Sequence, residues 1–312
     1  MTSPDRLAPL PRRRLIKAGL AFSGAAVTAT ALSAPSAAAA PDTRSRGVRG
    51  ELAELAELER HHGARLGVYA RNVRTGATVA HRAGERFAMC STFKAFAAAA
   101  VLREKAGRAS LDRVVHYPPH DILPNSPRTE ENQATGMTVA DLCAAAIQYS
   151  DNAAGNLLLR EIGGPAGLTR LYRSLGDRVS RLDRWEPELN TAIPGDPRDT
   201  TTPEAVAGSL ERLTLGGALA DADRERLVAW LKGNTTSAAR FRAGLPREWG
   251  VADKTGTGSY ATANDIGVAW TTRRTPLVLA VLTDKSTADA PVDESLIADA
   301  ARIVARTLAP GE

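Results

Sequence analysis

The sequence predicts an α/β protein with two lobes: an antiparallel sheet covered by helices, and a second lobe that is all helical. Strand-like apolar runs occur on both sides of a long middle stretch, residues 91–232, whose pattern is mostly helical. Strands at the two ends of a chain can meet in one sheet while the helical segment between them packs as its own lobe. With 312 residues, 43% of them hydrophobic, the chain is long enough to bury a sizeable core. We therefore expect residues 41–88 and 233–312 to form the α/β lobe and residues 89–232 the helical lobe.

The elements before the middle stretch follow from local periodicity. Leucines three residues apart predict a helix over Gly50–His61. An alternating pattern predicts a strand over Leu66–Val73. Thr75-Gly76 is typical of a turn, and it leads into a second strand over Thr78–His81. These two strands contribute the first part of the sheet.

Two loops interrupt the helical middle stretch. Its first helix covers Ala95–Arg103, and the first loop runs from Pro118 to Gly136. The second loop, residues 184–199, holds three prolines and a glycine, so it cannot be a regular helix or strand. After residue 250 the pattern predicts two strands and a closing amphipathic helix: Gly267–Thr272, Leu277–Thr283 and Asp293–Leu308.

Residues 1–40 read as an export signal. Arg12-Arg13-Arg14-Leu15-Ile16-Lys17 is a twin-arginine pattern, and a moderately apolar stretch, Ala18–Leu32, follows it. Small residues Ser36–Ala40 offer an Ala-x-Ala cleavage site before Pro41. The alternative is a basic tail or a membrane anchor, but the apolar stretch is short and rich in small residues for a membrane span. We expect a secreted protein whose signal peptide is removed.

The charge and the histidines exclude two classes of function. The net charge is +5, but residues 1–40 account for +4 of it, so the rest of the chain gives no electrostatic case for nucleic-acid binding. His116 and His120 have the spacing of a helical metal site, yet Pro118 and Pro119 between them make a shared helix face improbable. We expect no metal ion and no cofactor.

The tetrad Ser91-Thr92-Phe93-Lys94 opens the first helix of the middle stretch. Residues three apart on a helix share a face, so Lys94 is expected beside Ser91. A serine hydroxyl becomes a good nucleophile when a neighbouring group takes its proton, and an amine one turn away can do so. The serine would also lie at a helix N-terminus, where negative charge is favoured. By itself this motif is weak evidence for catalysis.

Three further motifs follow along the chain. They are Ser150-Asp151-Asn152, Arg184-Trp185-Glu186-Pro187-Glu188-Leu189-Asn190 and Lys254-Thr255-Gly256-Thr257-Gly258. Each has a structural alternative: the first is typical of a helix cap, the second of a solvated loop, and the third of a strand edge that carries a lysine for solubility. Four such motifs in one order, in a chain with an export signal, favour catalysis.

Together the four motifs resemble those of the class A serine β-lactamases, over essentially the whole chain beyond the signal. The resemblance implies the two-lobed fold shared by these enzymes and the penicillin-binding proteins. It implies hydrolysis of the β-lactam amide of penicillins and cephalosporins through a seryl acyl-enzyme, which confers antibiotic resistance. One rival is a penicillin-binding peptidase, and the other is a sensor that is acylated once. The loop that carries Glu186 argues against the peptidase, and the lack of a membrane domain after the signal argues against the sensor.

The resemblance assigns the acylation machinery. Ser91 is the nucleophile, and Lys94 accepts or relays its proton; the acylation base is Lys94 or Glu186 acting through water. The backbone N–H groups of Ser91 and Thr257 form the oxyanion hole. Ser150 passes a proton to the lactam nitrogen, and Lys254 polarises that hydroxyl and attracts the substrate carboxylate.

Deacylation is expected to depend on Glu186. A carboxylate, with Asn190 holding a water between them, activates that water for attack on the ester. The Glu186-Pro187 bond is expected to be cis by resemblance. Arg184 and Asp199 stand at the two ends of the 16-residue loop, and we expect them to pair and clamp it as an Ω-loop.

The resemblance also marks substrate-binding residues and two departures. Asn152, Thr255, Gly256 and Thr257 are the expected substrate contacts. The arginine that some members carry about ten residues after the Lys-Thr-Gly lysine is missing, so Arg240 is the expected carboxylate ligand; the alternative is a surface arginine. Asn125 stands where many members have an aromatic residue at the mouth of the cleft.

The two cysteines, Cys90 and Cys143, could form one disulfide in an exported protein, but each has an apolar helical context. We expect two buried free thiols. In family members with a disulfide at the nucleophile, the partner of Cys90 stands where this chain has Gly258, and the place opposite Cys143 is Ala98. For the whole protein we expect a monomer that binds small-molecule β-lactams, without nucleic acid or a membrane anchor.

Overall fold

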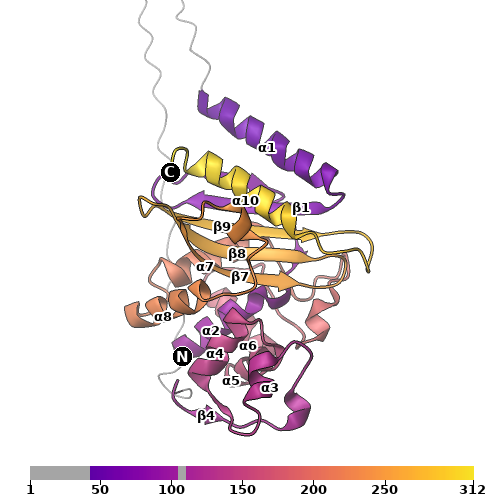
Figure 1. Cartoon of the computed structure of the whole chain (residues 1–312), viewed down its shortest axis with the longest axis vertical. Helices are drawn as coiled ribbons and strands as arrows, with labels where there is room; N and C mark the ends of the chain where they lie inside the picture. The colour runs from indigo at the N-terminus through magenta and orange to yellow at the C-terminus, as the bar shows by residue number, and fades with distance from the viewer. Residues whose placement is uncertain (1–42, 105–109) are drawn as a thin grey trace, which may run out of the picture. The chain divides into compact units, whose positions relative to one another are not determined.

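The computed structural model describes residues 43–104 and 110–312, so the predicted signal peptide lies outside the described residues. A five-stranded antiparallel sheet joins strands from both ends of this part of the chain in the order β2-β1-β9-β8-β7 (Figure 1). This confirms the α/β class with one antiparallel sheet. The strands are β1 Arg65–Asn72, β2 Thr78–His81, β7 Gly250–Thr257, β8 Ala263–Trp270 and β9 Pro276–Asp284.

Helices cover both faces of the sheet. In β9, Leu279 belongs to one apolar core, whereas its neighbours Val278 and Ala280 belong to another, because successive strand residues point to opposite faces. The first core lies under α1 (Thr43–His61) and α10 (Glu294–Leu308), which pack on each other (Figure 1). The second core continues into the helical lobe. Strand β9, which has an apolar core on each face, is therefore buried from Leu277 to Thr283 rather than on alternate residues.

The helical lobe is built around α2 (Phe93–Glu104), whose residues are buried from Phe93 through Leu102. A helix that is apolar on all sides needs neighbours all round, and the small alanines of its middle turns let them approach closely. Those neighbours are α4 Val139–Gln148, α5 Asn152–Glu161, α6 Gly164–Ser174 and α8 Asp221–Lys232 (Figure 1).

Shorter elements complete the described residues. No described helix is long and apolar enough to cross a membrane. The remaining helices are α3 Pro127–Glu131, α7 Pro203–Thr214 and α9 Phe241–Gly244, with 3-10 turns at Cys90–Thr92, Pro119–Asp121 and Glu188–Thr191. The two-residue strands are β3 Phe87–Ala88, β4 Val114–Val115, β5 Met137–Thr138 and β6 Thr200–Thr201.

Three predicted boundaries were wrong. Helix α1 begins at Thr43, before the expected Gly50. The predicted loop 118–136 contains α3, because Pro127 stands at a first-turn position, where its missing N–H costs nothing. Strand β8 begins at Ala263, four residues before the expected start. Its polar residues Asn264 and Asp265 are buried and belong to the strand.

Candidate active site

Ser91 and Lys94 lie side by side at the start of α2, as the spacing predicts. Ser91 is in the 3-10 turn that leads into the helix, and Lys94 is in the first helical turn. The Lys94 Nζ donates to Ser91 Oγ at 2.9 Å. It also donates to the Asn152 Oδ1 at 2.6 Å and to the Ser150 carbonyl at 2.7 Å. Two of the motifs found in the sequence therefore meet at one buried amine.

The Ser150-Asp151-Asn152 segment joins α4 to α5 and has two roles. The Asp151 side chain accepts from the Ala154 N–H and caps α5, so the structural alternative is right for this one residue. It also accepts from the Thr129 N–H at the start of α3. With the backbone fixed in this way, the side chains of Ser150 and Asn152 lie beside the two lysines of the site.

Lys254 lies on β7, the edge strand of the sheet, but it is not a solubilising edge residue. Its side chain is fully buried. The Nζ donates to Ser150 Oγ at 3.2 Å and to the Thr255 carbonyl at 2.8 Å. The Ser150 hydroxyl thus has Lys254 on one side and Lys94, at 3.5 Å, on the other.

Burial of the two amines weakens their hold on a proton. Burial lowers the pKa of Lys94 below its ordinary value, although the adjacent Glu186 acts in the opposite direction. Burial lowers the pKa of Lys254 well below its ordinary value, and the nearby Lys94 charge lowers it further. Amines whose pKa is lowered toward neutral pH are suited to proton transfer.

Glu186 faces the nucleophile rather than solvent. Its side chain is buried, and Oε1 accepts from the Ser91 hydroxyl at 3.2 Å and from the Lys94 Nζ at 2.9 Å. Asn190 donates from Nδ2 to Glu186 Oε2, while its own Oδ1 is buried without a partner among the described residues. The Glu186-Pro187 peptide is cis, as expected.

The Ω-loop, residues 184–199, is held at its ends and in its middle. The expected Arg184–Asp199 ion pair is present, with Nε and Oδ2 2.5 Å apart, and Asp199 also accepts two backbone N–H groups. Asn156 of α5 brackets Glu186: its Oδ1 accepts from the Glu186 N–H at 3.0 Å and its Nδ2 donates to the Glu186 carbonyl at 2.9 Å. No motif marks Asn156. It lies one turn after Asn152 on α5, so the two polar side chains share one face of that helix.

Arg240 is a pocket residue, so the surface alternative was wrong. Only 4% of it is exposed. Its guanidinium donates from Nη1 to the Gly256 carbonyl at 2.8 Å and from Nη2 to the Thr257 Oγ1 at 2.7 Å, and its Nε donates to Glu294 at 2.9 Å. Asn125 is exposed at the pocket mouth, and its Nδ2 donates to the Ser150 carbonyl at 3.0 Å.

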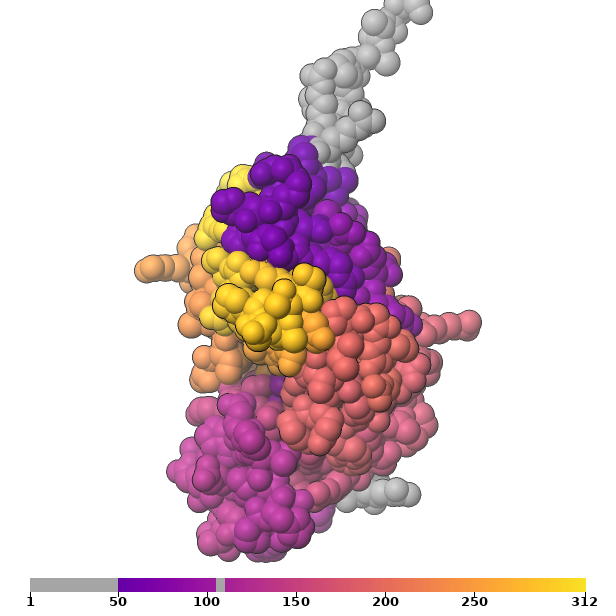
Figure 2. All heavy atoms as spheres, turned by 90° about the vertical axis from the view of Figure 1, so that its right-hand side faces the viewer, coloured from indigo at the N-terminus to yellow at the C-terminus, as the bar shows by residue number. Residues whose placement is uncertain are grey.

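One pocket of about 430 Å³ opens onto Ser91, Ser150 and Arg240, whereas the buried Lys94, Glu186 and Lys254 are not part of its lining. It holds three residues that the motifs did not predict: Tyr149, Thr236 and Glu294. On the face drawn in Figure 2, the segment near residue 200 (salmon) borders both an earlier segment (magenta) and a segment toward the C-terminus (golden yellow). The other lining residues are Ser91, Asn125, Ser150, Asn152, Asn190, Arg240, Thr255, Gly256 and Thr257.

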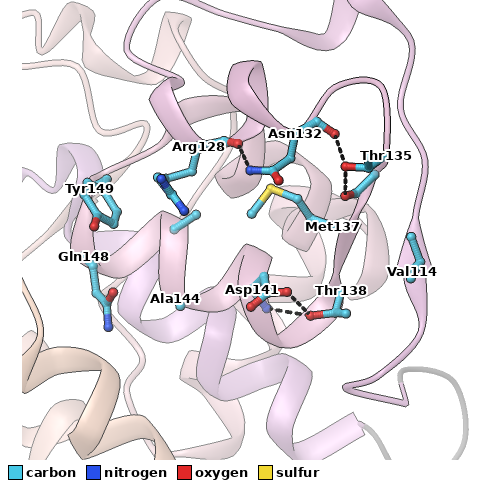
Figure 3. A pocket seen from close by; sticks show the side chains of 12 residues that line it. Val114, Arg128, Asn132, Thr135, Met137, Thr138, Asp141, Ala144, Gln148 and Tyr149 are labelled. Atoms are coloured by element: carbon cyan, nitrogen blue, oxygen red, sulfur yellow. Dashed lines mark hydrogen bonds between the residues drawn. The ribbon is translucent and has the colours of Figure 1, made fainter.

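A second pocket, of about 420 Å³, lies beyond Tyr149 on the helical lobe (Figure 3). Its polar side chains form hydrogen bonds or ion pairs with residues close by in the sequence. Asp141 and Thr138 form the cap of α4, and Arg128 pairs with Glu131. No set of acids, bases or nucleophiles converges on it within the described lining, so we assign the chemistry to the first pocket.

The cysteines are free and buried, as predicted. Burial raises the pKa of both thiols. A Cβ at position 258 would lie 2.7 Å from the Cys90 Sγ, so Gly258 packs directly against the turn that carries Ser91. Among residues 43–104 and 110–312, no group of three or more histidine, cysteine or acidic side chains is arranged to hold a metal ion.

The fold and the site define a two-lobed serine hydrolase. The model of the β-lactamase enzyme family matches residues 51–308. The chain belongs to this β-lactamase family and is a class A member of it. Among its relatives are the carbapenem-hydrolysing β-lactamase KPC of Klebsiella oxytoca, 56% identical over 251 residues (80% of this chain and 86% of that protein), and β-lactamase AST-1 of Nocardia asteroides, 50% identical over 298 residues (95% and 96%).

Solved structures give the same result. The β-lactamase of Streptomyces albus G has a TM-score of 0.81 and 54% identity, covering 83% of this chain and 99% of that one. A class A β-lactamase described as the last common ancestor of Gram-negative bacteria has a TM-score of 0.79 and 54% identity, covering 82% and 98%. Both support the two-lobed fold.

Proposed function

We propose that the protein hydrolyses the β-lactam amide of penicillins and cephalosporins through an ester on Ser91, and so confers antibiotic resistance. The observation that carries this proposal is the buried Glu186 carboxylate, 3.2 Å from the Ser91 hydroxyl, beside an Asn190 oxygen that has no partner among the described residues. A carboxylate on that side of the nucleophile supplies a base for water, which a single-turnover acylation site does not need.

Acylation uses the groups around Ser91. The hydroxyl oxygen attacks the lactam carbonyl while its proton passes to Lys94, or to Glu186 through water. The Ser91 and Thr257 backbone N–H groups stabilise the negative oxygen of the tetrahedral intermediate. The C–N bond then breaks, and Ser150 protonates the nitrogen. Lys254, 3.2 Å from Ser150 Oγ, supports that transfer.

The substrate carboxylate binds at the other end of the pocket. Arg240 and Thr257 are already paired there, and Thr255 presents a hydroxyl. Asn152 and Gly256 complete the contacts expected with the substrate. Asn125 leaves the mouth of the pocket without the aromatic wall that many family members have there.

Deacylation uses Glu186 and Asn190. A water between them gives one proton to Glu186 and a hydrogen bond to the Asn190 Oδ1, and its oxygen attacks the ester. The Ser91 oxygen leaves as a hydroxyl once it regains a proton. The Arg184–Asp199 pair keeps the Ω-loop, and with it the carboxylate, in register with the nucleophile.

The name of one relative adds a third candidate substrate class. That relative, 56% identical, is named as carbapenem-hydrolysing, so carbapenems join penicillins and cephalosporins as substrates to assay. For the whole chain we propose twin-arginine export directed by residues 1–40, removal of that signal, and action outside the cell as a monomer without a membrane anchor or nucleic-acid partner.

The decisive experiment replaces Glu186 with glutamine. Glu186→Gln removes the base without changing the shape of the side chain, so a chromogenic cephalosporin should still acylate Ser91 while turnover falls by about 10²–10⁴-fold. Stopped-flow kinetics and mass spectrometry of the protein would follow the adduct. Glu188→Gln, an exposed acid in the same loop, is the matched control and should turn over normally. No adduct in Glu186→Gln would reject the role of Glu186 in deacylation, and no turnover by the unmodified protein would exclude the proposed function.

A further inference from the structure

A hydroxyl pair lies inside the active-site pocket, and only one of its members, Thr255, enters the mechanism above. Thr236 Oγ1 and Thr255 Oγ1 are 2.5 Å apart, a distance at which one hydroxyl must donate to the other. Both residues line the pocket. Thr255 belongs to the Lys-Thr-Gly motif on β7, whereas Thr236 lies in the segment after α8, and no motif marks it.

The groups behind Thr236 set the direction of the hydrogen bonds. Asp253, two residues before Thr255, pairs with Arg242 at 3.0 Å and accepts from the Asn234 Nδ2 at 2.7 Å. A carboxylate only accepts, so the Asn234 amide must present its NH₂ to Asp253. Its Oδ1 therefore faces Thr236 and accepts from that hydroxyl at 2.8 Å.

The donor count decides what Thr255 does in the free enzyme. Thr236 has a single hydroxyl proton, and this proton is directed to Asn234. In the short contact between the two hydroxyls, Thr255 is consequently the donor and Thr236 the acceptor. The Thr255 proton is then unavailable to an incoming carboxylate. A carboxylate would meet an oxygen lone pair where it needs a donor.

We propose that Thr236 is a positioning residue for the carboxylate of the substrate, through reversal of this hydroxyl pair; the inference rests on the proposed function. When the carboxylate arrives, Thr255 turns its proton toward it, and Thr236 turns its own proton toward Thr255. No covalent bond changes. Thr236 thereby becomes the donor that supports Thr255 as it binds the anion.

The reversal leaves no polar group behind it unpaired. Asn234 Oδ1 loses the Thr236 hydroxyl proton but keeps the Thr236 backbone N–H, which donates to it at 3.1 Å. Asp253 keeps both of its partners throughout. A buried acceptor that lost its only donor would oppose the change, whereas here the second donor is already present.

The test compares variants at Thr236 with a matched control. Thr236→Val keeps the shape but removes the hydroxyl that holds Thr255 toward the carboxylate in the complex. The substrate must then order the Thr255 side chain by itself, so KM for a penicillin with a free carboxylate should rise about three- to tenfold, with little change in kcat. Thr236→Ser restores a hydroxyl and should restore KM. Thr235→Val is the control: its hydroxyl is exposed and donates to the Gln148 carbonyl, outside the pocket lining.

A substrate without the charge separates positioning from damage to the fold. The methyl ester of the same penicillin has no carboxylate, so Thr236→Val should treat it as the unmodified protein does. An equal loss on acid and ester, or a KM for the acid equal to that of Thr235→Val, would overturn the inference. Failure of the unmodified protein to turn over either substrate would instead overturn the proposed function, so the two failures are distinguishable.

Discussion

At the scale of single residues, the site holds two amines where water cannot reach them. Lys94 and Lys254 have no exposed side-chain surface, and only Lys94 is paired with a carboxylate, Glu186. Lys254 relies on neutral acceptors, the Ser150 hydroxyl and the Thr255 carbonyl. An amine buried in this way opposes folding, because a charge loses more hydration than two neutral acceptors return. The site thus holds groups that help chemistry at the expense of stability.

Replacing Lys254 with methionine should therefore raise stability while it abolishes activity. The pKa of Lys254 is lowered on folding, so the unfolded chain binds the proton more tightly and the lysine destabilises the folded state below the unfolded pKa. Lys254→Met removes this effect, and we expect a gain of about 1 kcal/mol at pH 7, or about 2–4 °C in Tm. The gain should shrink as the pH rises toward 10.5, where the unfolded lysine also loses its proton.

Thermal unfolding at pH 7 and pH 10 measures this difference. Lys232→Met is the control, because Lys232 is exposed and its charge stays in water. A Lys254→Met protein less stable than the unmodified protein at pH 7, or with the same difference at both pH values, would contradict the explanation.

At the scale of elements, the Ω-loop shows how an irregular segment is held rigid. Asp199 is fully buried and accepts from the Asp183 and Arg184 N–H groups as well as from the Arg184 guanidinium. A second pair in the loop, Asp196 with Arg198, lies near the surface, and half of the Arg198 side chain is exposed. Both pairs join an arginine to an aspartate, but they differ in burial. They should therefore contribute differently to the free energy of unfolding.

Asp199→Asn and Asp196→Asn compare them directly. Asparagine keeps the size but loses the charge, so the buried pair should lose about 2 kcal/mol and the exposed pair less than about 1 kcal/mol. The buried variant should also deacylate more slowly, because Glu186 moves with the loop. Thermal unfolding and the rate of loss of the acyl adduct are the measurements. Equal effects of the two variants would show that burial does not set the strength of the clamp.

Much of this could be predicted from the sequence, and the site residues that no motif marks share one physical cause. Ser91, Lys94 and Lys254 were predictable because their motifs are local and each spacing has a chemical reason. Asn156 and Thr236 were not, since each acts through partners far away in the sequence. The early start of β8 was missed for the same reason: Asn264 looks like a loop residue until its Nδ2 finds the Ala88 carbonyl across the fold.

At the scale of the whole molecule, the site exists only where the two lobes meet. Ser91 and Ser150 come from the helical part, Lys254 and Arg240 from the sheet and its flank, and Glu186 from the Ω-loop. Gly258, just after β7, lies between the Ω-loop and the turn that carries the nucleophile. A Cβ there would be 2.7 Å from the Asn190 carbonyl of the loop and 2.7 Å from the Cys90 Sγ beside the nucleophile.

Gly258→Ala should therefore disturb stability and catalysis together. The added methyl group must push the end of β7 away from the loop backbone, and strain of this kind costs about 1–3 kcal/mol. Asn190 would move with its carbonyl, so hydrolysis of a small penicillin should fall about tenfold or more, because small misplacements of catalytic groups are costly. Gly250→Ala, at the other end of β7, adds the same methyl group where nothing lies within 4 Å, and it should be nearly neutral. Thermal unfolding and kcat/KM for both variants test the contact, and Gly258→Ala behaving like Gly250→Ala would refute a tight junction of sheet, loop and nucleophile.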